Sequence, residues 1–347
     1  MQRMASIAFG LSVAMLGCGN DGGSADGDAD VTDADVTDDV TDDAPPPPDG
    51  MEPPARGFQV QSPEIVIEPG QEITYCYYFR TPNTETMAVK RFVSSMTPGS
   101  HHMIMFKTQN DVQPAGTVSS SGCGINISGT DAPQWIYAAQ TPESDLAFPT
   151  DDGTGKPLAI DIGPNSAAYF QMHYLNASDN PMTVRVTLNA EALEPTVEYT
   201  KTAAFVSYNG AIDIPANAPS HMERETCPVA SDAKFWLMST HAHKRAISTA
   251  VRNGSEVTFQ SNDWEHPGQK TWMTPAEFYS FNSSLTYECS YNNTGGPRVQ
   301  DGDSAQTDEM CMASGYYFRT AANKQAIPRF CYTIADGQSF PYPSWSN

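Results

Sequence analysis

From Phe58 onward, short runs rich in Val, Ile, Thr, Tyr and Phe alternate with Gly, Pro, Asn and Asp. Runs of this kind, bounded by turn residues, are typical of β-strands. No long stretch repeats with the 3.6-residue period of an amphipathic helix. We therefore expect an all-β protein, with strands that include Glu64–Ile67, Glu72–Phe79, His102–Phe106, Ala168–Leu175, Met182–Leu188, Thr202–Tyr208, Lys234–Ser239, Ala246–Val251, Leu285–Tyr291 and Gly315–Phe318.

The chain is long enough for two domains, because its 347 residues exceed one typical β domain. The spacing of the strands fits two tandem antiparallel β-sandwiches, jelly-roll-like, of roughly 140 residues each. We place the join near Ala190–Tyr199. The predicted domains are an N-terminal sandwich over 58–195 and a C-terminal sandwich over 196–347.

The segment before the first strand differs in composition. Residues 20–57 carry twelve acids, opposed only by Arg56, together with Asp-Val-Thr-Asp repeats and a run of four prolines. Such a segment cannot bury a core, so we expect a flexible, self-repelling tether over 18–57. Weak calcium binding by the Asp repeats is an alternative to a simple solvated tether. The net charge of −22 disfavours nucleic acid as a partner, because an acidic surface repels phosphate.

Residues 1–17 have the pattern of a bacterial lipoprotein signal peptide. Arg3 gives a charged start, and Met4–Leu16 is a mostly apolar run too short to span a bilayer. The run ends in Met-Leu-Gly-Cys, which resembles a lipobox, so we expect lipidation of Cys18. An ordinary signal peptide with an incidental cysteine is the alternative. A lipidated Cys18 would anchor the protein in the bacterial cell envelope, at the outer membrane, in the periplasm or at the cell surface.

The cysteine count agrees with an exported protein. The chain has seven cysteines, and assigning Cys18 to lipid leaves six. None of the six belongs to a Cys-x-x-Cys pair, which disfavours zinc ribbons and thioredoxin-type chemistry. We expect three disulfides formed in an oxidising compartment.

His241 and His243 follow a predicted strand at an i, i+2 spacing. Side chains at this spacing share one face, so Phe235, Leu237, Ser239 and the two imidazoles are expected to line one side. The two imidazoles would then reach one metal ion. A pair of surface histidines at a strand end is an equally good interpretation of this motif alone.

His101 and His102 are adjacent, and neighbours on a regular strand point to opposite faces. Both can contact one metal ion only if the chain bends there. The preceding Pro98-Gly99-Ser100 supplies an irregularity such as a bulge. Two unrelated histidines are the alternative.

His173 and Met310 are ambiguous when each is taken alone. His173 shares a strand face with Tyr169, Gln171 and Leu175, where a single histidine is normally structural. Met310 is one of 15 methionines, and a single methionine is usually a packing residue.

The order of these motifs along the chain is more specific than any one of them. His-His-Met begins at residue 101, Gln-Met-His-Tyr at 171, His-Ala-His at 241 and Asp-Glu-Met-Cys at 308. This order resembles the type II copper, ascorbate-dependent monooxygenases, a family that includes peptidylglycine α-hydroxylating monooxygenase and dopamine β-monooxygenase. The resemblance extends from about Phe58 to Ile334.

The resemblance implies two copper ions per chain, one in each sandwich. The first ion would take three imidazoles, and the second, which would activate O₂, would take two imidazoles and a soft thioether. The implied ligands are His101, His102 and His173 for the first ion, and His241, His243 and Met310 for the second. The resemblance also implies the disulfides Cys76–Cys123, Cys227–Cys331 and Cys289–Cys311.

The implied activity is that of an oxidoreductase that hydroxylates a C–H bond with O₂ and a one-electron donor such as ascorbate. Ser239, Met312 and Ser314 stand where the peptide-amidating relatives have polar anchors, so a small, non-peptide substrate is expected. Gln171 keeps a family glutamine and is a tentative catalytic residue, with a structural role as the alternative.

Two other functions are compatible with the sequence. One is a non-catalytic, extracytoplasmic copper-binding protein on the same scaffold, and the other is a purely structural, adhesin-like sandwich. His221 and His266 match no family ligand, so we expect structural or surface roles for them. The sequence predicts neither the substrate nor the oligomeric state.

Overall fold

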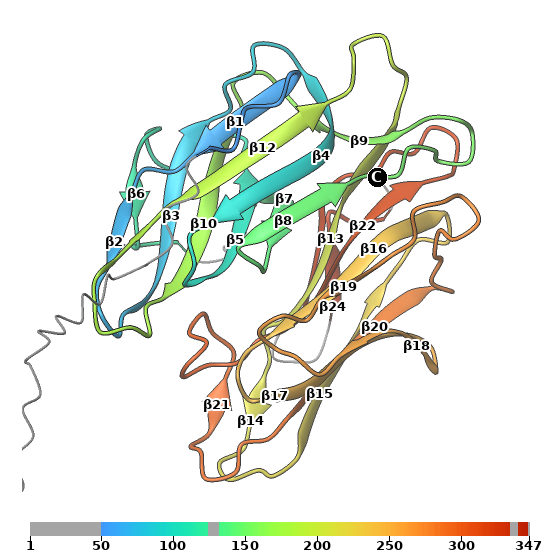
Figure 1. Ribbon diagram of the computed structural model, residues 1–347. Coiled ribbons are helices and arrows are strands. Elements are labelled where there is room, and N and C mark those ends of the chain that lie inside the picture. The colour runs from blue at the N-terminus through green and yellow to red at the C-terminus, as the bar shows by residue number, and fades with distance from the viewer. Residues whose placement is uncertain (1–49, 124–131, 334–338, 346–347) are drawn as a thin grey trace, which may run out of the picture. The chain divides into compact units, whose positions relative to one another are not determined.

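The computed structural model describes residues 50–123, 132–333 and 339–345. The predicted signal peptide, Cys18 and most of the predicted tether lie outside the described residues. All regular secondary structure in the described part is β-strand, so the predicted all-β class is confirmed (Figure 1). No helix in that part is long and apolar enough to cross a membrane.

The strands fall into an N-terminal half (residues 50–192) and a C-terminal half (residues 200–345). The N-terminal half contains β1 (Gly57–Gln61), β2 (Ile65–Ile67), β3 (Glu72–Arg80), β4 (Met87–Met96), β5 (Ser100–Lys107), β6 (Val118–Ser119), β7 (Gln134–Ala139), β8 (Glu143–Ala147), β9 (Leu158–Ile162), β10 (Ala167–Leu175), β11 (Met182–Val184) and β12 (Val186–Ala192). The C-terminal half contains β13 (Thr200–Asn209), β14 (Asp213–Ile214), β15 (His221–Pro228), β16 (Ala233–Ala242), β17 (Ala246–Asn253), β18 (Glu256–Ser261), β19 (Gln269–Thr271), β20 (Ser284–Tyr291), β21 (Val299–Gln300), β22 (Cys311–Arg319), β23 (Arg329–Thr333) and β24 (Ser339–Tyr342).

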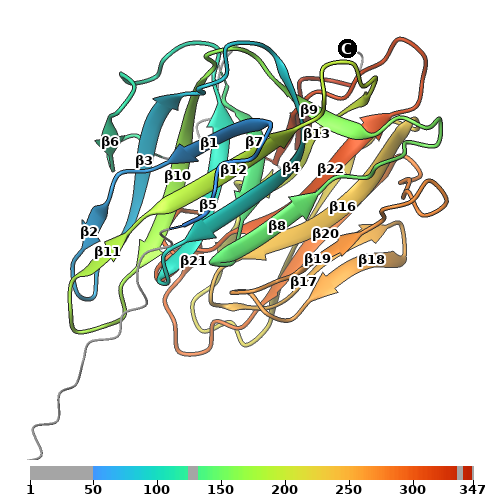
Figure 2. The same ribbon diagram turned by 45° about the horizontal axis from the view of Figure 1, so that its top comes forward.

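One large sheet runs through both halves. Its strand order is β1-β12-β4-β9-β13-β22-β16-β19, and the halves meet where β9 and β13 pair in parallel (Figures 1 and 2). A five-stranded sheet, β6-β3-β10-β5-β7, is the second layer of the N-terminal half. A four-stranded sheet, β15-β20-β17-β18, is the second layer of the C-terminal half. Each half is therefore a sandwich, and the two share one continuous layer.

The hydrophobic cores follow these layers. In the N-terminal half, Phe92 of the shared sheet packs on Tyr137 of the five-stranded sheet, with ring centroids 5.0 Å apart. The same core extends into the C-terminal half, where Phe148 lies 4.9 Å from the Trp236 ring. A second core, which includes Phe235, fills the C-terminal sandwich. Burial of apolar surface thus holds the halves together as well as each sandwich.

Three disulfides cross-link the described part of the chain. They join Cys76 to Cys123, Cys227 to Cys331, and Cys289 to Cys311. These are the same three pairs that the family resemblance implied. In the C-terminal sandwich, two of them link the four-stranded sheet to the shared sheet.

The predicted strand Met182–Leu188 is in fact two strands. β11 pairs with β2, whereas β12 pairs with β1 and β4, so the chain changes sheets at Arg185. At this break the Arg185 N–H donates to Thr97 Oγ1 at 2.9 Å, and the Val186 N–H donates to Ser62 Oγ at 3.0 Å. The apolar alternation continues through the break, which is why the pattern predicted a single strand.

A bulge in β16 overturns another expectation. Phe235 pairs with Tyr317 and Leu237 with Tyr316, which leaves Trp236 as the extra residue. Phe235 therefore lies in the second core and Leu237 in the first, and the prediction that they share one face is wrong. One extra residue reverses the alternation of faces along a strand.

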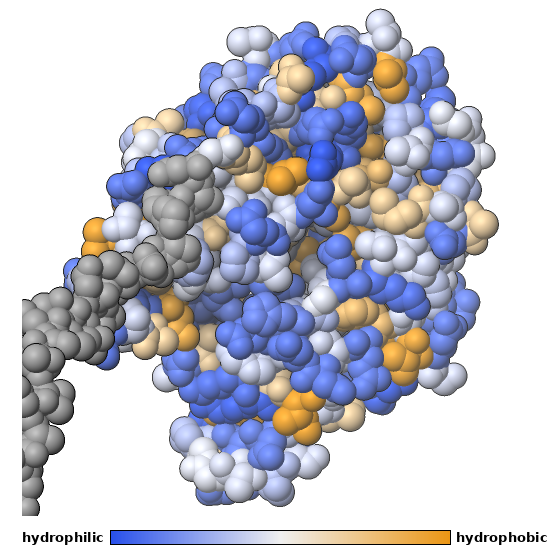
Figure 3. Space-filling view, in the orientation of Figure 1, coloured by the Kyte–Doolittle hydropathy of each residue, from blue (hydrophilic) through white to orange (hydrophobic). Residues whose placement is uncertain are grey.

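The surface is mostly polar. On the face shown in Figure 3, apolar residues form small spots separated by hydrophilic ones. The large hydrophobic side chains that are exposed include Val66, Met222 and Ile247, which lie on different strands or on strand margins. Single exposed hydrophobic side chains of this kind are normal on the surface of a folded protein.

Candidate metal centre

Three imidazoles of the N-terminal half converge at one end of the five-stranded sheet. His101 and His102 stand near the start of β5, and His173 stands near the end of the antiparallel β10. One ring nitrogen of each lies within 4.8 Å of the others. Nitrogens that bind one ion at about 2.0–2.1 Å lie within about 4 Å of each other, so small ring rotations would let all three reach one metal.

A bulge places the two adjacent histidines on the same side. His173 pairs with His102, but the next residue of β10, Tyr174, pairs with Ser100, so His101 is the extra residue of β5. Gly99, just before the strand, has a φ of 94°, in the region that favours glycine. The irregularity expected at Pro98-Gly99-Ser100 is therefore present. It is what allows neighbouring side chains to face one point.

A carboxylate orients His173. Glu72 Oε1 lies 3.1 Å from His173 Nε2 and fixes that nitrogen as a donor, which leaves Nδ1 toward the other imidazoles. The same carboxylate accepts the Ala305 N–H at 2.8 Å and the Ser304 hydroxyl at 3.0 Å. Glu72 thus connects a histidine of the N-terminal half to a loop of the C-terminal half.

His241 and His243 lie at the end of β16, with ring centroids 5.4 Å apart. The Nδ1–H of His241 donates to Gln140 Oε1 at 2.7 Å, across the boundary between the halves. His243 Nδ1 lies 3.4 Å from the backbone carbonyl of Asp308. Both bonds use Nδ1 and leave Nε2 as a possible metal ligand.

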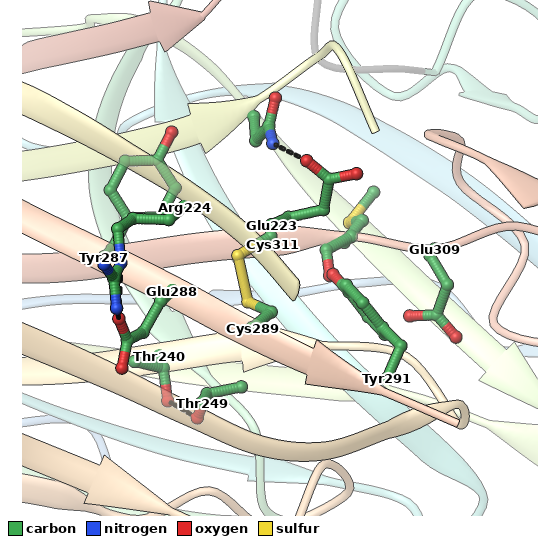
Figure 4. Close-up of a disulfide and its surroundings, with 12 residues drawn as sticks. Glu223, Arg224, Thr240, Thr249, Tyr287, Glu288, Cys289, Tyr291, Glu309 and Cys311 are labelled. Carbon is green, nitrogen blue, oxygen red and sulfur yellow. Dashed lines mark hydrogen bonds and ion pairs between the residues drawn. A yellow bond between two sulfur atoms is a disulfide. The ribbon is translucent and has the colours of Figure 1, made fainter. Parts of the chain in front are cut away.

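Met310 lies on the strongly fixed segment that leads into β22. The adjacent Cys311 is bonded to Cys289 (Figure 4). The Tyr291 hydroxyl donates to the Met310 carbonyl at 2.7 Å. The buried Glu309 carboxylate accepts the N–H of His243 at 3.1 Å, which ties the segment to the histidine pair. Met310 lines the same pocket as His241.

The two predicted sets of ligands meet in one group. The His241 ring lies 5.3 Å from that of His102 and 5.7 Å from that of His101. These separations match those inside the first set, where His102 and His173 are 5.2 Å apart. We call the five side chains the histidine cluster: His101, His102, His173, His241 and His243.

Burial keeps the histidine cluster neutral. Desolvation, together with a smaller effect of neighbouring imidazoles, lowers the pKa of His101 to about 4 and that of His243 to about 3. Desolvation also lowers the pKa of His102 and His241 well below 6.5. The pKa of His173 is lowered by burial as well, although Glu72 opposes the shift. All five are therefore unprotonated near neutral pH, the state that binds metal ions.

Each member of the histidine cluster has one buried ring nitrogen without a hydrogen-bond partner among the described residues. These atoms are His101 Nε2, His102 Nδ1, His173 Nδ1, His241 Nε2 and His243 Nε2. A buried polar atom left unpaired is costly, and such atoms in a native protein need an explanation. Five of them in one cluster fit a site for metal ions.

A pocket opens beside the histidine cluster. The surface of the pocket is mostly apolar, and Ile104, Trp135 and Met312 contribute to it, together with Ser314. Apart from His102 and His241, Asp303 is the only ionisable residue in that lining. The pocket is therefore weakly charged.

The remaining candidates have structural contacts. Gln171 lines the pocket, but its amide N–H donates to the Cys123 carbonyl at 2.9 Å and so holds the Cys76–Cys123 disulfide region in place. His221 contacts Glu223 at 2.8 Å, and the exposed His266 lies 4.0 Å from Asp263. Neither His221 nor His266 joins the histidine cluster.

Sequence reasoning missed the residues that orient the imidazoles. Glu72 lies 101 residues from His173, and Gln140 lies 101 residues from His241. Neither belongs to a motif, and each meets its histidine only because strands far apart in the sequence become neighbours. A single sequence carries no signal for such contacts.

Comparisons with known proteins gave only distant likenesses. No family model and no curated protein matches the chain. Among solved structures, the major capsid protein P2 from bacteriophage PM2 aligns with a TM-score of 0.32 and 6% identity, covering 77% of this chain and 99% of that one. PBCV-1 VP54, fitted into a reconstruction of the virophage Sputnik, gives 0.26 and 6%, with 80% and 98% covered. A triple jelly roll protein of an archaeal virus gives 0.17 and 10%, with 77% and 60% covered.

These findings correct the expected family. The likenesses are to viral jelly-roll proteins, and no family model or curated protein links the chain to the copper monooxygenases. The family assignment is therefore wrong, and so is the C–H hydroxylation that was inferred from it alone. The geometry also differs from the expected two separate sites, because all five imidazoles form one group. At such low scores the viral proteins transfer no function to this chain.

Proposed function

We propose that this protein binds copper ions in the histidine cluster, with Met310 as an additional sulfur ligand. The observation that carries the proposal is the group of five buried, neutral imidazoles that each leave one ring nitrogen unpaired. For three of them, the other nitrogen meets Glu72, Gln140 or the Asp308 carbonyl. Metal-ligating histidines in proteins have this arrangement, with one nitrogen on the ion and the other on an outer partner.

The donor set favours copper over the other common transition metals. Imidazole suits zinc, copper, iron and nickel, but divalent copper has the highest affinity in that series. Met310 lines the pocket beside the histidine cluster, and thioether sulfur selects monovalent copper. Hard cations such as magnesium and calcium prefer oxygen ligands and do not fit this site. Zinc is the competing occupant, and the experiment below includes it.

The test is metal retention by the full chain. Purified protein is incubated with Cu(II), with Cu(I) under reducing conditions, or with Zn(II), then desalted and analysed for metal content. We expect the wild type to retain copper, up to two ions per chain. The double variant His102→Ala/His241→Ala should lose most of it, because it removes one ligand from each predicted set.

His221→Ala is the matched control, because His221 lies outside the histidine cluster. Its copper content should equal that of the wild type. Circular dichroism establishes that both variants fold. The proposal fails if the wild type retains no more copper than the double variant, or if zinc is retained in strong preference to copper.

We also infer an extracytoplasmic location for the protein. The described residues form three disulfides, and disulfides persist in oxidising compartments. A lipid anchor at Cys18 stays a prediction from the sequence. Mass spectrometry of the protein from membranes of a bacterial expression host tests both, through the diacylated or triacylated mass of the mature N-terminus.

A further inference from the structure

We propose that the histidine cluster takes two copper ions as one magnetically coupled pair, rather than as two independent centres. The proposal rests on the copper binding argued above and adds how the ions are arranged. It departs from the sequence expectation of one isolated ion in each sandwich. The observations that carry it are the ring separations, the position of the free nitrogens and the contacts that fix the boundary between the halves.

The ring separations show no gap between the two predicted ligand sets. Within the first set, centroids are 5.2–5.4 Å apart, and within the second set 5.4 Å. Across the boundary, His241 is 5.3 Å from His102 and 5.7 Å from His101. An ion bound by His241 therefore shares its surroundings with an ion bound by His101 and His102.

The unpaired ring nitrogens also support two neighbouring ions. His102 Nδ1 and His241 Nε2 are both buried, both lack a hydrogen-bond partner among the described residues, and belong to rings in contact. Buried ring nitrogens without a partner are unfavourable, and metal ions bound in the cluster would pair them. One ion held by the first set would leave the nitrogens of His241 and His243 unpaired. A second ion in the same group pairs all five.

Polar contacts between the halves hold His241 against the first set. Gln140, which follows β7 in the N-terminal half, accepts the Nδ1–H of His241 and donates to the Thr240 carbonyl at 3.4 Å. Near the same boundary, the Tyr316 hydroxyl donates to the Ile136 carbonyl at 3.0 Å. The close approach therefore rests on the half-buried Gln140 and the buried Tyr316 and not on one surface contact.

Electron paramagnetic resonance tests the proposal, because each isolated Cu(II) ion has one unpaired electron and two neighbouring ions couple. The full chain is titrated with copper sulfate, desalted, and measured for total copper and for the integrated signal. We expect the signal to follow total copper at the first equivalent. At the second equivalent it should fall well below total copper, or show a half-field transition.

Gln140→Ala probes the geometry, and Gln260→Ala is the matched control on an exposed strand far along the chain. Losing the bond to Gln140 frees the His241 ring, so the coupled fraction should decrease at unchanged copper content. The control should behave as the wild type. Thermal unfolding checks that both variants fold.

Three results overturn the proposal. Two bound ions with a signal equal to total copper and no half-field transition would mean independent centres, and copper binding itself would stand. Saturation at one ion would exclude the pair. Failure to bind copper at all would remove the proposed function together with the pair.

Discussion

The hydrogen-bond partner of a histidine in this site determines which of its two ring nitrogens stays free. Glu72 takes Nε2 of His173, whereas Gln140 takes Nδ1 of His241, so the free atoms differ between the two rings. Both free atoms are buried. The choice of partner at each position therefore directs lone pairs toward the centre of the cluster, as in known metal sites.

Met310 provides the sharpest prediction at this scale. Replacing it with leucine keeps the volume and removes the sulfur. Retention of Cu(I) should fall by about tenfold or more, in the range seen when groups around a metal are removed, while Cu(II) binding changes less. Competition with a colorimetric Cu(I) chelator and with a Cu(II) chelator measures the two affinities separately.

Met312→Leu is the control for this experiment, because Met312 lines the same pocket. We expect it to leave both affinities close to those of the wild type. A larger loss of Cu(I) affinity for Met312→Leu than for Met310→Leu would show that the wrong sulfur was assigned.

At the scale of strands, two bulges decide what the site contains. The extra residue at His101 brings neighbouring imidazoles to one side. The extra residue at Trp236 puts Leu237, rather than Phe235, on the side that His241 shares. One inserted residue reverses every side chain beyond it, so both bulges set the composition of a whole strand face.

The two disulfides of the C-terminal half should differ in how much they stabilise the fold and in how much they support the copper site. Closing longer loops stabilises more, which gives about 3.4 kcal/mol for the 22-residue separation of Cys289–Cys311 and about 4.7 kcal/mol for the 104-residue separation of Cys227–Cys331. Replacing both cysteines of one disulfide with serine should lower the free energy of unfolding. The loss should be larger for Cys227–Cys331 than for Cys289–Cys311. Urea denaturation measures it.

Loss of a disulfide should affect copper binding in the opposite order, with the larger effect for Cys289–Cys311. Cys311 is next to Met310, so losing Cys289–Cys311 should weaken Cu(I) retention. Losing Cys227–Cys331 should leave it nearly unchanged in the folded protein. Equal effects of the two changes on Cu(I) retention would contradict the local role.

Every run predicted to be a strand overlaps a described strand, whereas β4, β7 and β15 were not among the predicted runs. Alternating or continuous apolar runs located β3, β10 and β20 to within a residue or two. The break at Arg185 and the bulge at Trp236 left no mark in the pattern, because their cause lies in the pairing of strands. The histidines were found as short motifs, but their merging into one cluster depends on how the two sandwiches pack, which no local pattern encodes.

At the scale of the whole molecule, the buried histidines should make the metal-free protein sensitive to acid. In the unfolded chain their pKa returns to about 6.5, whereas in the folded protein it is about 4 for His101 and about 3 for His243. As the pH falls below about 6.5, the unfolded chain takes up protons that the folded protein does not. The free energy of unfolding should therefore decrease, by at most about 1.4 kcal/mol per pH unit for each group, until the folded-state pKa values are reached.

Denaturation curves of the metal-free protein between about pH 7 and pH 4 measure this slope. Saturating copper should move the loss of stability to lower pH, because the ion competes with protons for the same nitrogens. The variant His102→Ala/His241→Ala should show a shallower slope than the wild type. Stability that stays constant across this range, with no difference between the proteins, would contradict the burial argument.

The crossed bonds at the boundary have a kinetic consequence. Gln140 of the N-terminal half holds a histidine of the C-terminal half, and Glu72 holds the loop at Ser304 and Ala305. Release of an ion held by ligands of both halves requires those ligands to move apart, which these bonds oppose. Exchange with free ions in solution would then be slow even where affinity is moderate, and the chain would act as a long-lived reservoir rather than a rapid buffer.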